Sequence, residues 1–496
     1  MLLVSSFSAF LNNTPLVAIL MPYVHTWSKR HSIAPSKLMI PLSYAAILGG
    51  CATLIGTSTN LIVNGMVIEQ KGVEGLHELE LFDFFAVGGP MILIGIIFML
   101  LIGKHLLPNR KDVITDFSRK RREYLVEVQV RPRSKLIGKS IEEAELRNLK
   151  GLFLVEIHRN DHRLTAVSPT IILKENDILI FAGDTDTIAD MINSNTGLKL
   201  TQVGMFSKKA HTEVREVVVS HNSTLIGKTI KEAYFRGKYD AAIIAVHRNG
   251  ERISGKIGSV KLEAGDVLLL LTGVDFPERS RDTLDFYSIS KVRDFQKLPP
   301  WKVAVLLGGT ALTILLAALG FVKLFIGLIV LISVITMLGI TNAKDIPKSL
   351  DFNLAAIIAL ALAIGTAMIK SGVAEMVALF FIHVLKPLGI WGLMFGIYAV
   401  TSILAAYITN KAAVAIIFPI AVTIAVDLNL NPIPFVLLVS FAGAANFMTP
   451  HGYQTNLMVY GPGGYSFKDY MKVGLPLTII YMFAAVIGLG LTYNLL

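Results

Sequence analysis

The feature that most constrains this chain is a set of long, uncharged apolar runs near both ends. An α-helix rises about 1.5 Å per residue, so about 20 apolar residues cross the hydrocarbon core of a bilayer. Residues 302–320, 324–340, 352–369 and 473–493 reach or approach this length, and so do residues 84–103. Hydrophobic residues make up 53% of the chain and charged residues 17%, which excludes an ordinary soluble protein. We expect a polytopic α-helical membrane protein.

Charge is concentrated between the two apolar ends, and this divides the chain into predicted domains. An N-terminal membrane block spans residues 1–107, a basic linker residues 108–123, and a C-terminal membrane block residues 299–496. The net charge of +10 does not indicate nucleic-acid binding, because many basic residues flank apolar segments and no basic recognition motif is present. The single cysteine, Cys51, excludes an intrachain disulfide.

The distribution of basic residues predicts the orientation in the membrane. Lys29, Arg30 and Lys37 share one loop, whereas the loop over residues 69–83 is acidic. Basic residues again follow the run at 84–103. Since Lys and Arg accumulate on the cytoplasmic side, residues 104–300 should be cytoplasmic and the protein should span the inner (plasma) membrane several times.

The charged stretch contains an internal repeat. Leu-Ile-Gly-Lys at residues 136–139 recurs 89 residues later at 225–228, and His-Arg-Asn at 158–160 recurs at 247–249. Each unit is predicted to contain a strand, a short helix after Gly-Lys, a β-rich run such as residues 241–247, a Gly-Asp turn and a further strand. The insert should therefore be a tandem α+β domain.

These residues resemble the C-terminal module of regulators of K⁺ conductance, called TrkA-C. The resemblance covers residues 124–195 (first TrkA-C domain) and 213–285 (second TrkA-C domain). It implies a cytoplasmic regulatory module that often dimerises and sometimes binds a small-molecule effector.

Three further apolar stretches, residues 38–70, 391–427 and 433–460, are interrupted by polar, Gly-rich or Pro-containing patches. Unpaired backbone groups are not tolerated in hydrocarbon, so a helix break at membrane depth must be satisfied by protein or by a watery cavity. Asn13 precedes Pro22 by nine residues, as Asn410 precedes Pro419. A Thr-Asn pair follows in each block, at 59–60 and at 455–456. Asn60 lies 47 residues after Asn13, and Asn456 lies 46 residues after Asn410. Each break is a candidate binding site.

Helix N-termini attract anions, whereas free carbonyls and the side-chain oxygens of Asn, Ser and Thr suit Na⁺. Small polar residues are also common at tight helix crossings. Their recurrence at matched spacing in both blocks favours a binding site. The candidate substrate- and ion-binding residues are Asn12, Asn13, Thr14, Gly56, Thr57, Ser58, Thr59 and Asn60 in the first block, and Thr409, Asn410, Lys411, Thr449, Pro450, His451, Gly452, Thr455 and Asn456 in the second.

On these motifs the chain resembles the divalent anion:sodium symporter family, and its branch with TrkA-C repeats between two membrane halves. The family implies inverted-repeat halves with re-entrant hairpins and broken helices, and an elevator-type carrier, usually a homodimer, that moves sulfate or di- and tricarboxylates with Na⁺. The resemblance places the hairpin tips at residues 12–14 and 409–410 and the unwound helices at 59–60 and 455–456. Na⁺ would bind near Asn13, Asn60, Asn410 and Asn456, and no other cofactor is implied.

The chain departs from the family pattern in two respects, at Lys411 and in the number of residues before Asn13. Lys411 stands where a small neutral residue is expected; its ammonium could replace a cation, attract the anion or extend to the membrane surface. His451 could titrate, donate to an anion or be satisfied by helix packing. Twelve residues precede Asn13, about 100 fewer than the equivalence of the two halves predicts.

The sequence therefore predicts a secondary active transporter of small anions, sulfate or di/tricarboxylate, coupled to Na⁺ and regulated by the insert. Two alternatives are an arsenite or Na⁺/H⁺ exchanger and a non-transporting membrane sensor that uses the TrkA-C domains. An enzyme is not expected, because the sequence shows no nucleophile with a base and no metal-ligand cluster.

Overall fold

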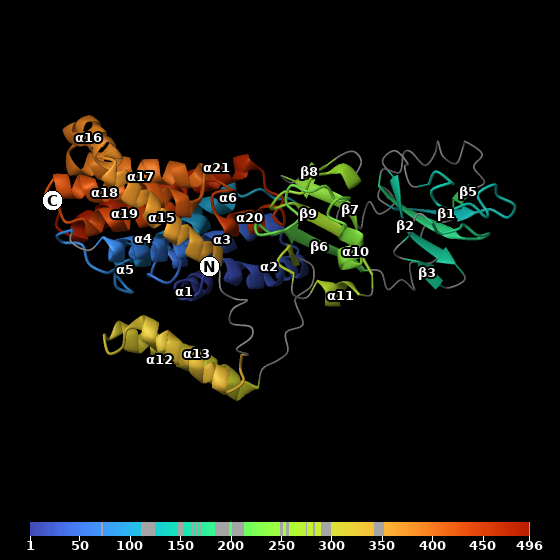
Figure 1. Cartoon of the computed structure of the whole chain (residues 1–496), viewed down its shortest axis with the longest axis horizontal. Coiled ribbons are helices and arrows are strands. Elements are labelled where there is room, and N and C mark those ends of the chain that lie inside the picture. Colours follow the sequence, from blue (N-terminus) through green and yellow to red (C-terminus); the bar gives the residue numbers. More distant parts are fainter. Residues whose placement is uncertain are drawn as a thin grey trace.

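The computed structural model shows a helical bundle and two small sheets (Figure 1). The structure describes residues 1–70, 73–110, 125–146, 152–159, 162–164, 167, 170–183, 198–200, 213–248, 251–253, 257–273, 275–280, 283–288, 299–341 and 352–495.

The N-terminal block contains the helices α1 (Leu2–Ser8), α2 (Asn13–Arg30), α3 (Met39–Gly50), α4 (Ser58–Glu69) and α5 (Phe85–Phe98). The 3₁₀ turn η1 (Pro35–Lys37) precedes α3, and α5 continues through the π-helical η2 (Met99–Gly103) into α6 (Lys104–Leu106). The apolar stretch at 38–70 is thus two helices separated by a break at residues 51–57.

The C-terminal block contains more helices, with breaks at equivalent places. Its helices are α12 (Pro300–Ala318), α13 (Leu324–Met337), α15 (Phe352–Lys370), α16 (Val373–Leu385), α17 (Gly389–Tyr407), α18 (Asn410–Asp427), α19 (Ile433–Ala444), α20 (Gln454–Tyr460) and α21 (Phe467–Thr492). The 3₁₀ turn η5 (Lys386–Leu388) joins α16 to α17. Residues 445–453 separate α19 from α20, and Ile408 and Thr409 separate α17 from α18.

Several of these helices can cross a membrane. Among the described residues five helices are long and apolar enough, or six when the bent pair α15 and α16 counts as one span. Large apolar side chains such as Leu307, Phe325 and Val330 are exposed on α12 and α13, an arrangement suited to lipid rather than water. The broken helices α3, α4, α19 and α20 instead contribute to the main buried core.

The insert forms two antiparallel five-stranded sheets with the same topology. We call residues 125–200 the first unit and residues 213–288 the second unit. The first unit has β1 (Leu125–Val130), β2 (Leu152–Arg159), β3 (His162–Leu164), β4 (Ile178–Gly183) and β5 (Leu198–Leu200) in the order β3-β2-β4-β1-β5. The second has β6 (Glu213–Val219), β7 (Ala241–Arg248), β8 (Glu251–Arg252), β9 (Val267–Thr272) and β10 (Phe286–Ser288) in the order β10-β6-β9-β7-β8.

The two units also share a register irregularity 89 residues apart, between Leu154 and Glu156 in β2 and between Ile243 and Ala245 in β7. The strands expected at 241–247 and 267–271 are present as β7 and β9. The helix expected after Gly-Lys is present in the second unit as the short α10 (Phe235–Tyr239), which begins seven residues after Lys228. In the first unit, residues 147–150, at the corresponding position, lie outside the described residues.

The second unit lies between the helical bundle and the first unit, and it packs against the bundle (Figure 1). Val218 and Val267 are fully buried in the same core as the membrane helices. Gly265, at φ +87°, lies so close to Leu457 of α20 that a Cβ would be 2.8 Å from the Leu457 side chain. A Cβ on Gly461 would likewise meet Val267. The insert therefore touches the helix that carries Thr455 and Asn456.

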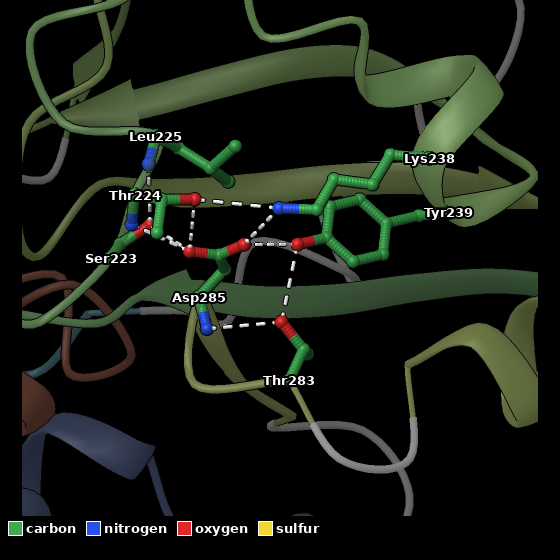
Figure 2. A network of polar contacts seen from close by, with 7 residues as sticks. All are labelled: Ser223, Thr224, Leu225, Lys238, Tyr239, Thr283 and Asp285. Carbon is green, nitrogen blue, oxygen red and sulfur yellow. Dashed lines mark hydrogen bonds and ion pairs between the residues drawn. The ribbon is translucent and has the colours of Figure 1, made fainter.

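A polar network closes the second unit at the end of its sheet (Figure 2). The Asp285 carboxylate accepts hydrogen bonds from Lys238 (2.8 Å), from the backbone N–H (2.6 Å) and hydroxyl (2.9 Å) of Thr224, and from the Tyr239 hydroxyl. Burial opposes ionisation of Asp285, but these donors outweigh it and hold the pKa of its carboxyl well below the ordinary range. The network ties the loop at Ser223 to β10.

Candidate functional site

The two helix breaks are braced in the same way by the predicted asparagines. The side-chain amide of Asn60 donates to the carbonyls of Gly50 (3.4 Å) and Thr53 (2.8 Å). The amide of Asn456 donates to the carbonyls of Asn446 (3.0 Å) and Thr449 (3.1 Å). In both breaks the asparagine reaches ten and seven residues back along the chain. The amides thereby satisfy carbonyls that the interrupted helices leave free.

Each bracing asparagine also receives a hydrogen bond from the other membrane block. Ser440 of α19 donates to the Asn60 side-chain oxygen at 2.9 Å. Ser43 of α3 donates to the Asn456 side-chain oxygen at 2.7 Å and lies 2.9 Å from the Thr455 hydroxyl. All these side chains are buried. The breaks of the two blocks therefore meet in one buried polar region.

At the first predicted tip, the side-chain oxygen and nitrogen of Asn13, at the start of α2, both have hydrogen-bond partners. Its side-chain oxygen accepts from the Ser8 hydroxyl at 2.5 Å, and its amide donates to the Tyr453 hydroxyl at 2.5 Å. Thr57 lies 3.1 Å from the same tyrosine hydroxyl, and Asn13 packs directly over Gly50. Thr14 donates to the Gln454 side chain at 2.9 Å. The first tip thus contacts the second break.

The second predicted tip begins α18. The Thr409 hydroxyl accepts from the Ala412 N–H at 3.2 Å and caps the helix, as expected at such a position. Asn410 follows and is buried, but its side-chain oxygen has no hydrogen-bond partner among the described residues. Thr449 accepts from the Gly452 N–H at 3.2 Å and donates to the Ala406 carbonyl at 3.1 Å, which links the second break to the end of α17.

The remaining predicted residues lie around these contacts. Asn12 and His451 are exposed, Lys411 and Ser58 are half-buried, and Gly56, Thr59, Pro450 and Gly452 are buried. The His451 ring lies 6.2 Å from the ring of Tyr460. The polar groups gathered at the breaks are neutral amides, hydroxyls and carbonyls. No group of three or more His, Cys, Asp or Glu side chains able to hold a metal occurs within the described ranges. This chemistry suits small anions and hard monovalent cations rather than zinc.

Residues that the fold brings to the site but that the sequence did not predict include Ser43, Ser440, Asn446, Tyr453 and Gln454. The two serines lie inside apolar helices and carry no motif of their own. Asn446, Tyr453 and Gln454 belong to the second break, and Asn446 lies ten residues before Asn456. That spacing, which matches Gly50 to Asn60, was the signal available in the sequence.

Comparison with known proteins agrees with this architecture. The family described as citrate transporter matches residues 1–337 and 295–495. A putative sulfur deprivation response regulator of Chlamydomonas reinhardtii is 33% identical over 96% of this chain and 83% of its own length. An uncharacterized transporter of Synechocystis sp. is 33% identical over 98% of this chain and 81% of its own length.

A probable sodium/sulfate cotransporter of Chlamydomonas reinhardtii is 25% identical over 96% of this chain and 76% of its own length. Two relatives are 33% identical over more than four fifths of their own length, and the family match includes both membrane blocks. This chain belongs to the citrate transporter family and is a multi-pass membrane transporter rather than an enzyme.

Proposed function

We propose that this protein is a secondary active transporter of small anions, sulfate or di/tricarboxylate, coupled to Na⁺. The observation that carries the proposal is the pair of braced helix breaks, whose asparagine side-chain oxygens accept hydrogen bonds from serines of the opposite membrane block. Carriers use discontinuous helices in this way, because the exposed backbone and side-chain oxygens bind ions while N–H groups bind anions. The relatives named sodium/sulfate cotransporters support the same substrate class.

The matched contacts of the two blocks also support an inverted-repeat carrier of the elevator type, in which the polar region at the breaks moves across the membrane as one body. The reciprocal serine bonds hold the breaks together during such a movement. We further propose that the carrier is a homodimer in the inner (plasma) membrane, with residues 104–300 in the cytoplasm.

We propose that the insert, as a pair of TrkA-C domains, regulates transport through α20. The turn at Gly265 and the strand residue Val267 pack on Leu457 and Gly461, at either end of the segment that follows Asn456. On the same side Arg110, which follows α6, forms an ion pair with Asp469 at 2.9 Å. A small effector that moved the second unit would therefore act directly on the helix bearing Asn456, and the docked unit is proposed to slow transport.

Uptake by proteoliposomes tests the transport proposal. Radiolabelled sulfate, succinate and citrate are supplied with an inward Na⁺ gradient or with K⁺ in its place. We expect one of these anions to accumulate with Na⁺ only. Asn410→Ala removes a buried polar group at the second tip and should lower the uptake rate by at least about tenfold, the loss expected for one hydrogen bond to a charged ligand.

Ser333→Ala is the matched control, because Ser333 lies on exposed α13 and bonds only its own helix, at the Ile329 carbonyl. It should transport at the unmodified rate. Equal uptake in Asn410→Ala and Ser333→Ala, with both proteins inserted normally, contradicts the assignment of the tip. Accumulation that ignores Na⁺ contradicts the coupling.

The name of one relative, a sulfur deprivation response regulator, favours a second candidate: a sensor that binds an anion at the breaks and signals through the insert. Such a sensor would bind sulfate without accumulating it. Sulfate-dependent protection of α20 from hydrogen exchange, in protein that fails the uptake assay, would identify it.

A further inference from the structure

The groups that surround the Asp285 carboxylate in the second unit all donate hydrogen bonds to it (Figure 2). We call Ser223, Thr224, Lys238 and Tyr239 the anion cradle. The Ser223 hydroxyl donates to the carboxylate at 3.1 Å, in addition to the bonds from Thr224, Lys238 and Tyr239 described above. Proteins bind small anions such as sulfate and carboxylates with this combination of one positive charge, hydroxyls and a backbone N–H. Asp285 therefore occupies an anion-binding arrangement as an internal ligand.

A carboxylate at this position is not needed to form the sheet. Leu198 of β5 holds the place of Phe286 of β10, because their partners on β1 and β6 are 89 residues apart in the sequence. The residue before Leu198 in the sequence is Gly197, which has no side chain, where the second unit has Asp285. The first unit nevertheless forms a five-stranded sheet of the same order. The common fold thus does not account for Asp285, which belongs to the unit that packs on the membrane block.

The anion cradle is accessible from solvent although the carboxylate inside it is covered. Asp285 is 4% exposed, whereas Thr224 is exposed and the Lys238 side chain is 46% exposed. A dissolved anion can therefore reach Lys238 and Thr224 while the unit stays folded. A dianion attracts the Lys238 ammonium more strongly than the single charge of a carboxylate does. The cradle favours a small dianion as the competitor of Asp285.

Release of Asp285 would act on the face that packs against the membrane block. Asp285 directly precedes β10, and its backbone carbonyl accepts a hydrogen bond from the Ser220 N–H at 2.9 Å. Two residues later Tyr287 pairs with Val218, and it packs against the core cluster that contains Val218 and the membrane helices. An edge strand of three residues has few bonds of its own, so it depends on neighbouring contacts for its position. Loss of the bonds to Asp285 would loosen β10 and with it Tyr287.

We propose that the anion cradle is an effector site for a small cytosolic dianion, sulfate or a dicarboxylate, which displaces the Asp285 carboxylate and loosens β10. Asp285 is tethered beside the cradle, so its effective concentration is on the order of millimolar or higher, and a dissolved anion competes only in that range. The site thus responds to an abundant anion. The effect on transport rests on the proposed regulation by the insert: a loosened β10 weakens docking of the second unit and relieves the slowing of uptake.

Hydrogen exchange of the full chain in detergent tests the site without any transport measurement. Potassium sulfate or potassium succinate is added, and potassium chloride at the same ionic strength is the reference. In the unmodified protein at least one of the two dianions should displace Asp285 and make the exchange of β10 faster. The strands β1 and β4 of the first unit should not change.

Asp285→Ala empties the anion cradle, so the same dianion should now fill it and make the exchange of β10 and β6 slower than in chloride. Its affinity for this variant should be at least about tenfold higher than for the unmodified protein, because a charged hydrogen-bonding competitor is gone. A purely structural carboxylate predicts no such reversal of sign. The double variant Asp285→Ala with Lys238→Met is the matched control, since it removes the positive charge, and the dianion should not slow its exchange.

If Asp285→Ala fails to fold, Asp285→Asn replaces it, and its exchange should likewise become slower in the dianion. Sulfate and succinate that act like chloride on both the unmodified protein and the Asp285 variant would overturn the proposal. Equal slowing in the double variant would also overturn it, because the anion would then act elsewhere. The expected exchange pattern in a protein without anion uptake would instead refute only the transport function.

Discussion

The two units of the insert have one fold but different surroundings. Both bind an arginine to an aspartate through two hydrogen bonds, Arg159 to Asp177 at 2.8 and 2.7 Å and Arg248 to Asp266 at 2.7 and 2.8 Å. In the second unit Val218 is fully buried against the membrane core, whereas its counterpart Gln129 is half-buried.

The turn that precedes β4 in the first unit and β9 in the second also differs in burial between the two units. Gly265 packs on Leu457, while its counterpart Asn176 is exposed and accepts a hydrogen bond from Gln129 at 3.3 Å. The shared Arg–Asp ion pair is thus a feature of the common fold of both units rather than of docking. A few exchanged surface residues decide which unit docks on the membrane block.

The largest effect is expected from making the docking face of the second unit resemble that of the first. Val218→Gln removes an apolar side chain and buries an amide without a partner, which should weaken docking by about 3 kcal/mol. Hydrogen exchange of the peptide containing Gly461 should become faster. If the docked unit slows transport, anion uptake should also rise. A threefold rise corresponds to less than about 1 kcal/mol in the transport barrier, so a loss of about 3 kcal/mol in docking should raise uptake at least about threefold.

Gln129→Val is the matched control for this change, because it alters the equivalent position of the first unit. It should affect neither the exchange of α20 nor uptake. Similar effects of the two variants would show that the docking assignment is wrong.

A smaller effect is expected from the Asp285 network of the second unit. At the 89-residue spacing of the repeat, Leu149 and Lys150 correspond in sequence to Lys238 and Tyr239, so the first unit does not carry the same side chains at these two positions. Asp285→Asn should destabilise the second unit by about 2 kcal/mol at pH 7, at the lower end for a buried pair because Lys238 is partly exposed. Amide exchange of β6 and β9 measures this, with β1 and β4 as the internal reference.

The effect of Asp285 should depend on pH. The folded-state pKa of this carboxyl lies below its unfolded value of about 3.9, so its contribution is complete well above pH 4 and is lost as the pH falls toward the folded-state pKa. The difference between Asp285→Asn and the unmodified protein should therefore shrink in acid. A constant difference from pH 7 to pH 3 would assign the effect to lost packing.

The smallest effect is expected at the exchanged turn of the first unit. Asn176 has φ +63°, a conformation that glycine adopts without strain, so Asn176→Gly loses one exposed hydrogen bond and should change unit stability by less than about 1 kcal/mol. Gly265→Asn should instead displace α20, because its Cβ meets Leu457. Hydrogen exchange of α20 is measured in both variants, Asn176→Gly and Gly265→Asn. Equal exchange rates in the two would contradict the packing of the Gly265 turn on α20.

Much of the fold was predictable from the sequence, because local patterns carry it. Long apolar runs correspond to α5, α12, α13, α15 and α21, and the polar interruptions correspond to the breaks before α4, α18 and α20. The 89-residue repeat corresponds to two sheets of one topology. The exact helix boundaries were harder to predict, because they depend on caps such as the Ser466 and Asp469 capping box at the start of α21. The hydrophobic pattern of the sequence is weak around that cap.

The candidate site was predictable only where a motif repeats. Asn13, Asn60, Asn410 and Asn456 recur at matched spacing, which indicated their importance without indicating their roles. Asn60 and Asn456 brace the backbone, and their serine partners come from residues about 380 and 413 positions away in the chain. No local pattern in a sequence reports such a partner.

The sequence by itself determined that this chain spans a membrane, that a repeated sheet domain is inserted between two helical blocks, and that polar breaks interrupt the same helices in both. Apolar length, charge and repetition are properties of single segments, and they act before any long-range contact forms. The tertiary structure alone decided that the Tyr453 hydroxyl accepts a hydrogen bond from Asn13 and that, among the described residues, the second unit packs on the membrane block. Those outcomes depend on which side chains from distant segments meet, and a change of one residue at such a meeting point alters the balance of hydrogen bonds.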